Sequence, residues 1–219
     1  MTNTLLLDVD GTLVDTNYLH AVTWVRAFDS VGLVVPAWRV HRAIGMGGDR
    51  LVEVVAGEHA EARHGDAVRK AWELGFEKVL DEVRPLEGAH RFVTAAATEH
   101  GYAVVLASSG KREHVEHYLD LLDVRDVIAG FTTAEDAEDS KPAPDLLQIA
   151  LAKTDAERAV VVGDSVWDCD AARRIGLPVV AVRTGGFGEA ELLEHGATFV
   201  YRELDDLRAD LSDLPLVTV

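Results

Sequence analysis

The sequence predicts an α/β protein built on a doubly wound parallel sheet, with a helical block inserted after the first strand. Two observations carry this prediction. Short apolar runs without polar alternation recur along the chain, as in strands that are covered on both faces, and helix-length segments separate them. Residues 15–84 interrupt this alternation, because that stretch contains helical patterns and no buried strand pattern.

The strands and helices of the sheet region follow in chain order. Strong strand patterns cover Thr4–Leu7, Tyr102–Ala107, Ala159–Val162 and Pro178–Val182, and weaker ones cover Val127–Phe131 and Thr198–Val200. Helices are predicted at Glu87–His100, Lys111–Leu122, Pro144–Lys153, Val166–Ile175 and Glu189–His195. In doubly wound sheets, ligands bind outside the carboxyl ends of the strands. Asp8, Ser108 and Asp164 all occur at such ends.

The inserted block is predicted to be helical throughout. Its amphipathic segments are Tyr18–Val31, Ala37–Ile44, Gly48–Val55 and Asp66–Val83. Turn-forming residues at Asp15-Thr16 and around Pro85 mark the two crossings. We therefore expect residues 1–14 and 85–219 to form the core and residues 15–84 to form a lid over the strand ends.

Composition narrows the function classes. The chain has 219 residues, enough for one large domain or a domain with an insertion. Its formal net charge of −17 argues against a nucleic-acid partner, which requires a basic surface. We expect a cytoplasmic protein without a membrane partner. The single Cys169 cannot form an intramolecular disulfide, and no basic segment precedes the first apolar run. No apolar run approaches the ~20 residues needed to span a membrane. Nothing in the composition indicates an oligomeric state.

Two aspartates follow the first apolar run. Asp8 and Asp10 come directly after it, with Gly11 and Thr12 behind them. Residues i and i+2 of a strand point to the same side, so both carboxylates can reach one site. Close anions repel each other, and a hard divalent cation relieves that repulsion. The pattern suits a carboxylate nucleophile beside an acid/base partner. An Asp-rich turn that caps the next helix is the alternative.

Three further motifs lie at expected loops. Ser108-Ser109-Gly110 leads from a strand into a helix and could cradle an anion, although a serine helix cap reads the same way. Lys141 is followed by a rigid Pro-x-Pro frame and could neutralise carboxylates and a phosphate, or be solvated. Asp164 ends a strand and Asp168 lies one helical turn further on. Asp168 could support a cation or serve as a first-turn helix acid.

These motifs, in this order and with the interposed helical block, resemble the haloacid dehalogenase-like hydrolase superfamily over nearly the whole chain. Asp8-Val9-Asp10-Gly11-Thr12 resembles its first motif, Ser108 its second, Lys141 its third, and Gly163-Asp164 with Asp168 its fourth. The resemblance implies a Rossmann-like core with an all-helical cap. It also implies phosphoryl transfer through an aspartyl-phosphate.

The resemblance assigns roles to these residues. Asp8 would attack phosphorus, and Asp10 would protonate the leaving alcohol and then deprotonate water. Mg²⁺ would be held by Asp8, the Asp10 carbonyl and Asp164, with Asp168 in support.

Ser108 and Lys141 would hold the phosphoryl group, and we place Thr12 and Ser109 with them as phosphate-binding candidates. As an acid near neutral pH, Asp10 needs a raised pKa, which burial beside other carboxylates would favour.

Within the superfamily, Asp10 followed by Gly-Thr indicates phosphate esters. A Mg²⁺-dependent phosphatase of a small phosphorylated metabolite, of the phosphoglycolate or sugar phosphate type, is therefore the leading prediction. An intramolecular phosphotransferase is the alternative, since Asp15-Thr16 with His20 and Trp24 is similar to the β-phosphoglucomutases. A loose alignment puts Gly48 where those mutases carry an arginine, with Arg50 displaced. A binding protein that keeps the fold without turnover is the remaining alternative.

Several residues of the block and the core have weaker signals. Gly45, Met46 and Gly47 are expected in a cap loop that faces the site, and His20 is a candidate substrate or cap residue. His114 and His117 are expected on a solvated helix face. Tryptophans are expected in the cap core, at Trp24, Trp38 and Trp72. Cys169 is expected to be a small buried residue.

Overall fold

The computed structural model describes residues 2–137 and 139–219. Its sheet has the strand order β3-β2-β1-β4-β5-β6, and all pairs along this path are parallel. The strands are β1 (Asn3–Leu7), β2 (Ala103–Ala107), β3 (Gly130–Thr132), β4 (Arg158–Gly163), β5 (Val179–Val182) and β6 (Ala197–Tyr201). A short β7 (Val217–Thr218) pairs antiparallel with β4. The predicted fold class is confirmed.

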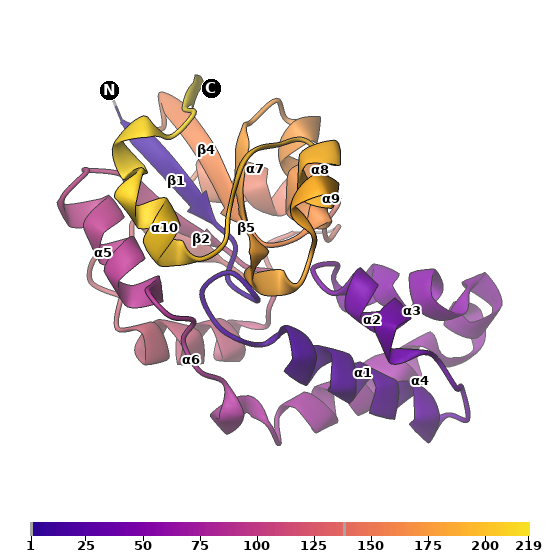
Figure 1. Ribbon diagram of the computed structural model, residues 1–219. Coiled ribbons are helices and arrows are strands. Elements are labelled where there is room, and N and C mark those ends of the chain that lie inside the picture. The colour runs from indigo at the N-terminus through magenta and orange to yellow at the C-terminus, as the bar shows by residue number, and fades with distance from the viewer. Residues whose placement is uncertain (1, 138) are drawn as a thin grey trace.

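Helices cover both faces of the sheet (Figure 1). One layer contains α5 (Ala89–Thr98), α6 (Arg112–Leu122) and α10 (Leu204–Ala209). The other contains α7 (Asp145–Leu151), α8 (Val166–Arg174) and α9 (Glu189–Glu194). Alternate strand residues face the two layers, so that Leu5 and Leu7 join one core and Leu6 joins the other. Burial on both faces explains the unbroken apolar runs.

The inserted block folds as helices that lie beside the carboxyl ends of the strands (Figure 1). These helices are α1 (Asn17–Ser30), α2 (Ala37–Ala43), α3 (Gly48–Ala56) and α4 (Glu58–Phe76). They enclose their own apolar core, which includes Trp24, Phe28, Leu51 and Val68. The block therefore has an interior separate from the two cores of the sheet.

The two crossings between this block and the sheet lie side by side. The Asp15 amide donates to the Arg84 carbonyl at 2.9 Å, and Val14 forms an isolated bridge with Pro85. We propose these paired segments as the hinge and residues 15–84 as the cap. Within the described residues, no helix combines the length and apolar character needed to cross a membrane.

Some elements differ from the prediction. Helix α4 begins at Glu58, eight residues before the expected start. The sequence does not indicate this start, because the first half of the helix is polar and solvent-facing and has no apolar periodicity. Helix α10 and strand β7 lie in a C-terminal stretch where the sequence predicts no element. The expectation for Trp38 is wrong: its side chain is 65% exposed, whereas Trp24 is buried as expected.

Candidate active site

Three parallel strands deliver polar residues to one edge of the sheet. Asp8 follows β1, Ser108 follows β2, and Asp164 follows β4, and all three side chains are buried. Because β1 lies between β2 and β4, these residues are neighbours in space. The strand order thus gathers motifs that are far apart in the sequence.

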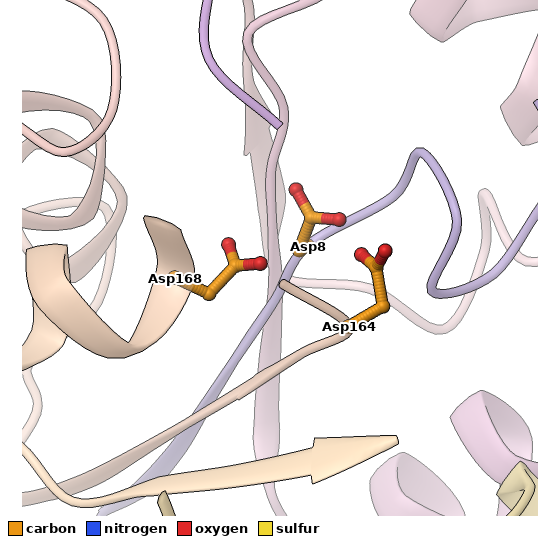
Figure 2. A group of neighbouring side chains, drawn as sticks. All are labelled: Asp8, Asp164 and Asp168. Atoms are coloured by element: carbon orange, nitrogen blue, oxygen red, sulfur yellow. The ribbon is translucent and has the colours of Figure 1, made fainter. Parts of the chain in front are cut away.

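A cluster of carboxylates forms at this edge. Asp8, Asp164 and Asp168 come from the end of β1, the loop after β4 and the first turn of α8, and Figure 2 shows their carboxylates converging. Each offers an oxygen, and these oxygens lie within 4.8 Å of one another. Three buried anions at this distance need positive charge to offset their repulsion.

Lys141 supplies part of that charge. Its side chain is 2% exposed, and its ammonium group pairs with Asp8 and, at 2.6 Å, with Asp168. The Thr12 hydroxyl lies 3.0 Å from Asp8 Oδ2 and 2.9 Å from Asp164 Oδ1, so it ties the two carboxylates together. Thr12 is therefore engaged with the carboxylates rather than turned toward an open cavity.

Two supporting residues are absent from the sequence-based prediction. Asn17 Nδ2 donates to Asp164 Oδ2 at 2.9 Å, and Ser165 forms a reciprocal capping box with Asp168 at the start of α8. The Ser-x-x-Asp spacing at 165–168 was a readable signal for the capping box. Asn17 had no such signal, because its contact depends on how α1 packs against the sheet edge.

Glycines allow the carboxylates to pack closely. A Cβ at Gly185 would lie 1.7 Å from Asp164 Oδ2, and one at Gly163 would lie 2.4 Å from Asp168 Cγ. Gly11 has a φ of +81°, and a Cβ there would also strike Asp164. Only glycine fits these three positions without moving the carboxylates.

Burial and the neighbouring charges both shift the pKa values of the cluster. Burial raises the pKa of Asp8 to about 6, with Lys141 opposing and Asp168 adding to the rise. Burial and the charges of Asp8 and Asp168 raise the pKa of Asp164 well above its usual value. Lys141 behaves conversely: burial opposes its charged form, but the two partner carboxylates outweigh burial and raise its pKa.

This arrangement fits a divalent cation. The donors are hard carboxylate oxygens, and the Lys141 ammonium group pairs with two of the three carboxylates. Mg²⁺ prefers one or two carboxylates together with waters and substrate oxygens. Asp8 and Asp164, which the Thr12 hydroxyl holds side by side, could supply two such carboxylates.

Asp10 lies apart from this cluster and faces the cap. The Thr16 hydroxyl donates to Asp10 Oδ1 at 2.8 Å, and His20 Nε2 lies 3.2 Å from the same oxygen. Burial alone raises the pKa of Asp10, but the contacts from His20 and Thr16 outweigh it, and the net pKa is lowered. The expectation of a raised pKa is therefore wrong for this conformation, because cap residues stabilise the ionised form.

The cap encloses a small cavity of about 70 Å³ over Asp8 and Asp10. Gly45, Met46 and Gly47 line it, as expected for a cap loop facing the site, and Ser109 lines it from the core. The Ser108 hydroxyl accepts the Gly110 amide at 3.0 Å, which shapes the loop after β2.

Two residues of α6 line this cavity, which the sequence does not predict. His114 is 4% exposed, packs against Phe76 with the two rings tilted, and lines the cavity, so the expectation of a solvated face is wrong for it. Tyr118, one turn further on, also lines the cavity. The i, i+4 spacing of His114 and Tyr118 places them on one face, but the sequence does not show that the cap covers this face.

The cap contacts the core on two sides. On one side, His41 Nε2 lies 3.0 Å from the Gly185 carbonyl, and Arg42 pairs with Glu191. On the other, the Gly47 amide donates to Ser140 Oγ at 3.0 Å. The structure thus has the cap closed over the carboxylates.

Comparisons with known proteins agree with this geometry. Residues 5–182 match the sequence model of the family described as haloacid dehalogenase-like hydrolase. The pyrophosphatase PpaX of Bacillus cereus is 28% identical over 97% of each chain. A hydrolase from Pseudomonas syringae superposes with a TM-score of 0.89 at 28% identity, covering 98% of this chain and 99% of that one.

A more distant structure shares the fold. CbbY from Rhodobacter sphaeroides, solved in complex with phosphate, has a TM-score of 0.73 at 21% identity and covers 94% of this chain and 96% of its own. The family match spans β1 to β5 and therefore includes all the strand ends described above. The chain belongs to the haloacid dehalogenase-like hydrolases.

Proposed function

We propose that the protein is a Mg²⁺-dependent phosphatase that hydrolyses a small phosphate ester through an aspartyl-phosphate on Asp8. One observation carries the proposal: a buried Asp8 is paired with Lys141 and clustered with Asp164, and Asp10 lines the same cavity. A nucleophile, a fixed cation, a cation site and a second carboxylate are the groups that phosphoryl transfer requires.

In this proposal, an Asp8 oxygen attacks phosphorus and the bond to the leaving oxygen breaks. Asp10 gives its proton to that oxygen. In the second half-reaction Asp10 takes a proton from water, and the water oxygen displaces Asp8 from phosphorus. Lys141 and the Ser108 loop offset charge on the transferred group. The contacts that His20 and Thr16 make with Asp10 favour its ionised form, which suits the step with water.

Asp8, the Asp10 backbone carbonyl and Asp164 would hold Mg²⁺, with Asp168 supporting through Lys141 and Ser165. The cation would supply charge neutralisation at phosphoryl oxygens. Thr12 is proposed to position the two ligating carboxylates, since its hydroxyl reaches both.

The contacts of Arg50 support our proposal of hydrolysis rather than transfer to a second position on the substrate. Arg50, the residue displaced from the expected mutase position, pairs with Asp139 at 3.2 Å and Asp49 at 3.8 Å. An arginine that grips a second phosphate would have to leave both partners. We therefore retain the phosphatase as the proposed function.

The test compares wild type with Asp8→Asn on an aryl phosphate, with Mg²⁺ and with a chelator. We expect the wild type to release phosphate with Mg²⁺ and not with the chelator. The kcat of Asp8→Asn should fall by several orders of magnitude, because an amide is a poor nucleophile. Equal turnover in all arms would contradict the proposal. Asp170→Asn is the matched control, because Asp170 lies on α8 and pairs with Arg173 and His195 away from the cluster.

A further inference from the structure

A second, larger cavity adjoins the active-site cavity. Its volume is about 490 Å³, and it shares Trp24, Trp72, Gly47, Ser109 and other wall residues with the cavity over Asp8. Small-molecule sites have volumes of about 300–1,000 Å³. A phosphate ester bound at Asp8 would direct its leaving group into this space, which we call the leaving-group cavity.

The three cations of the leaving-group cavity are already paired with carboxylates. Among the described residues that line it, three are cationic and four are carboxylates. Lys111 from the core pairs with Glu73 from cap helix α4, and Lys70 pairs with the same carboxylate at 2.9 Å. The third cation, Arg69, is bound by Glu61 and Asp66 at 2.8 Å each.

Glu73 has the central place in this arrangement. Hydrogen bonds from Lys111 and Lys70 lower its pKa to about 2, so it stays ionised at any working pH. Its pairing with Lys111 also joins the cap to the core at the wall of the cavity. An anionic leaving group that approached Lys111 would lie beside the ionised Glu73 carboxylate.

The rest of the wall suits an uncharged, hydroxylated group. Trp24, Trp72 and Leu146 supply apolar surface, and the backbone at the lining glycines supplies neutral polar groups. Trp72 lines both cavities, so its ring lies where the two spaces meet.

We infer that the substrate is a phosphate monoester with an uncharged, hydroxyl-rich leaving group larger than glycolate, and that Glu73 excludes anionic leaving groups by holding Lys111. This inference rests on the proposed phosphatase function and selects among its possible substrates. It separates polyol and sugar monophosphates from phosphoglycolate-like acids and from inorganic pyrophosphate. The discrimination is electrostatic: a like charge beside an ionised carboxylate is unfavourable, and a hydroxyl is not.

The experiment measures kcat/KM on substrates that differ in one group. Glycerol 3-phosphate and 3-phosphoglycerate have leaving groups of similar size, and the second carries a carboxylate. Sorbitol 6-phosphate adds length without charge, and inorganic pyrophosphate adds charge without carbon. An aryl phosphate reports phosphatase activity independently of this choice. The variants are Glu73→Gln and, as a matched control on the same helix end, Glu77→Gln, whose carboxylate is exposed and forms no ion pair within residues 2–137 and 139–219.

For the wild type, we expect kcat/KM at least tenfold higher on glycerol 3-phosphate than on 3-phosphoglycerate or pyrophosphate, and higher again on sorbitol 6-phosphate. Glu73→Gln should raise the 3-phosphoglycerate to glycerol 3-phosphate ratio about fivefold, the size expected for a partly exposed charge pair. Glu77→Gln should leave that ratio unchanged.

A wild-type preference for 3-phosphoglycerate or pyrophosphate would overturn the inference, as would equal ratios in the two variants. Either result, obtained alongside aryl phosphate turnover, leaves the phosphatase proposal standing. Absence of aryl phosphate turnover by the wild type would overturn the proposed function and, with it, the inference.

Discussion

Asp10 has two cap residues on one of its carboxylate oxygens. Thr16 and His20 both contact Oδ1, and both belong to the segment that leads from the hinge into α1. The charge state of Asp10 therefore depends on where the cap lies. With a dianionic phosphate bound nearby, the added negative charge would raise the pKa of Asp10 toward the protonated form that the first half-reaction needs.

His20→Ala tests this coupling. Removing His20 takes away two of the contributions that lower the pKa of Asp10, its hydrogen bond and its charge, so that pKa should rise. The Asp10 carboxylate would then be ionised, and able to act as a base, only at higher pH. We expect the acidic limb of the kcat profile to move to higher pH and kcat at neutral pH to fall about tenfold, within the usual range for acid–base catalysis. Steady-state kinetics at several pH values measure both effects.

His20→Gln is the companion variant, since its amide can still donate to Asp10. It should keep more of the wild-type profile than His20→Ala. The ring of His20 also stacks on Phe76 at 4.0 Å, so thermal melts of both variants are needed to separate packing from proton handling. An unshifted profile in His20→Ala would contradict the role given to His20.

At the scale of elements, the short helical turn η2 (Arg183–Gly185) after β5 shapes the carboxylate cluster. Gly185 lies against Asp164 Oδ2, and its carbonyl accepts from Asn17 and contacts His41 of the cap. One turn thereby fixes a proposed metal ligand and a cap contact together. Its backbone must approach the carboxylate more closely than any side chain allows.

Gly185→Ala should displace Asp164, since the new Cβ would lie 1.7 Å from its oxygen. We expect kcat/KM to fall about 10²-fold, the cost of misplacing a reacting group by roughly 1 Å. Gly188→Ala is the matched control three residues on, where a Cβ would meet nothing within 4 Å. If both variants lose activity equally, the close approach at Gly185 is not what positions Asp164.

The elements that the sequence predicts well are those with strong local signals. The four strong strands lie within a residue or two of their predicted bounds, and the motif residues Asp8, Ser108 and Asp164 lie at their ends. The start of α4 cannot be predicted, because the first half of this helix is polar and has no apolar residues at helical spacing. His114 and Asn17 gain their roles from the packing of cap against core, which no local pattern encodes.

On the scale of the whole molecule, the excess of acidic residues extends into the buried site. The formal net charge is −17, and of the three clustered carboxylates only Asp8 and Asp168 pair with an ammonium group, that of Lys141, among the described residues. Without a bound cation, this repulsion opposes the folded state. Stability and metal binding should therefore be linked across the entire domain.

The sign of this linkage follows from Asp8. Its pKa is raised from 3.8 to about 6, so between these values the folded protein binds more protons than the unfolded chain. The contribution of this group to stability is fully present below pH 3.8 and is lost as the pH rises through about 6. The raised pKa of Asp164 acts in the same direction. A cation that binds the ionised carboxylates should restore the lost stability, and most strongly above pH 6.

Thermal melts with and without Mg²⁺ at pH 5 and pH 7.5 test this expectation. At a Mg²⁺ concentration of 100 times Kd, the gain is about 2.7 kcal/mol, or roughly 5–10 °C in Tm for a chain of this length. The gain should be smaller at pH 5, because protons compete for the same oxygens. Asp164→Asn should raise the metal-free Tm at pH 7.5 and abolish most of the Mg²⁺ effect, since the amide removes a buried charge and a ligand together. An equal Mg²⁺ gain at both pH values, or a full gain in Asp164→Asn, would place the cation elsewhere.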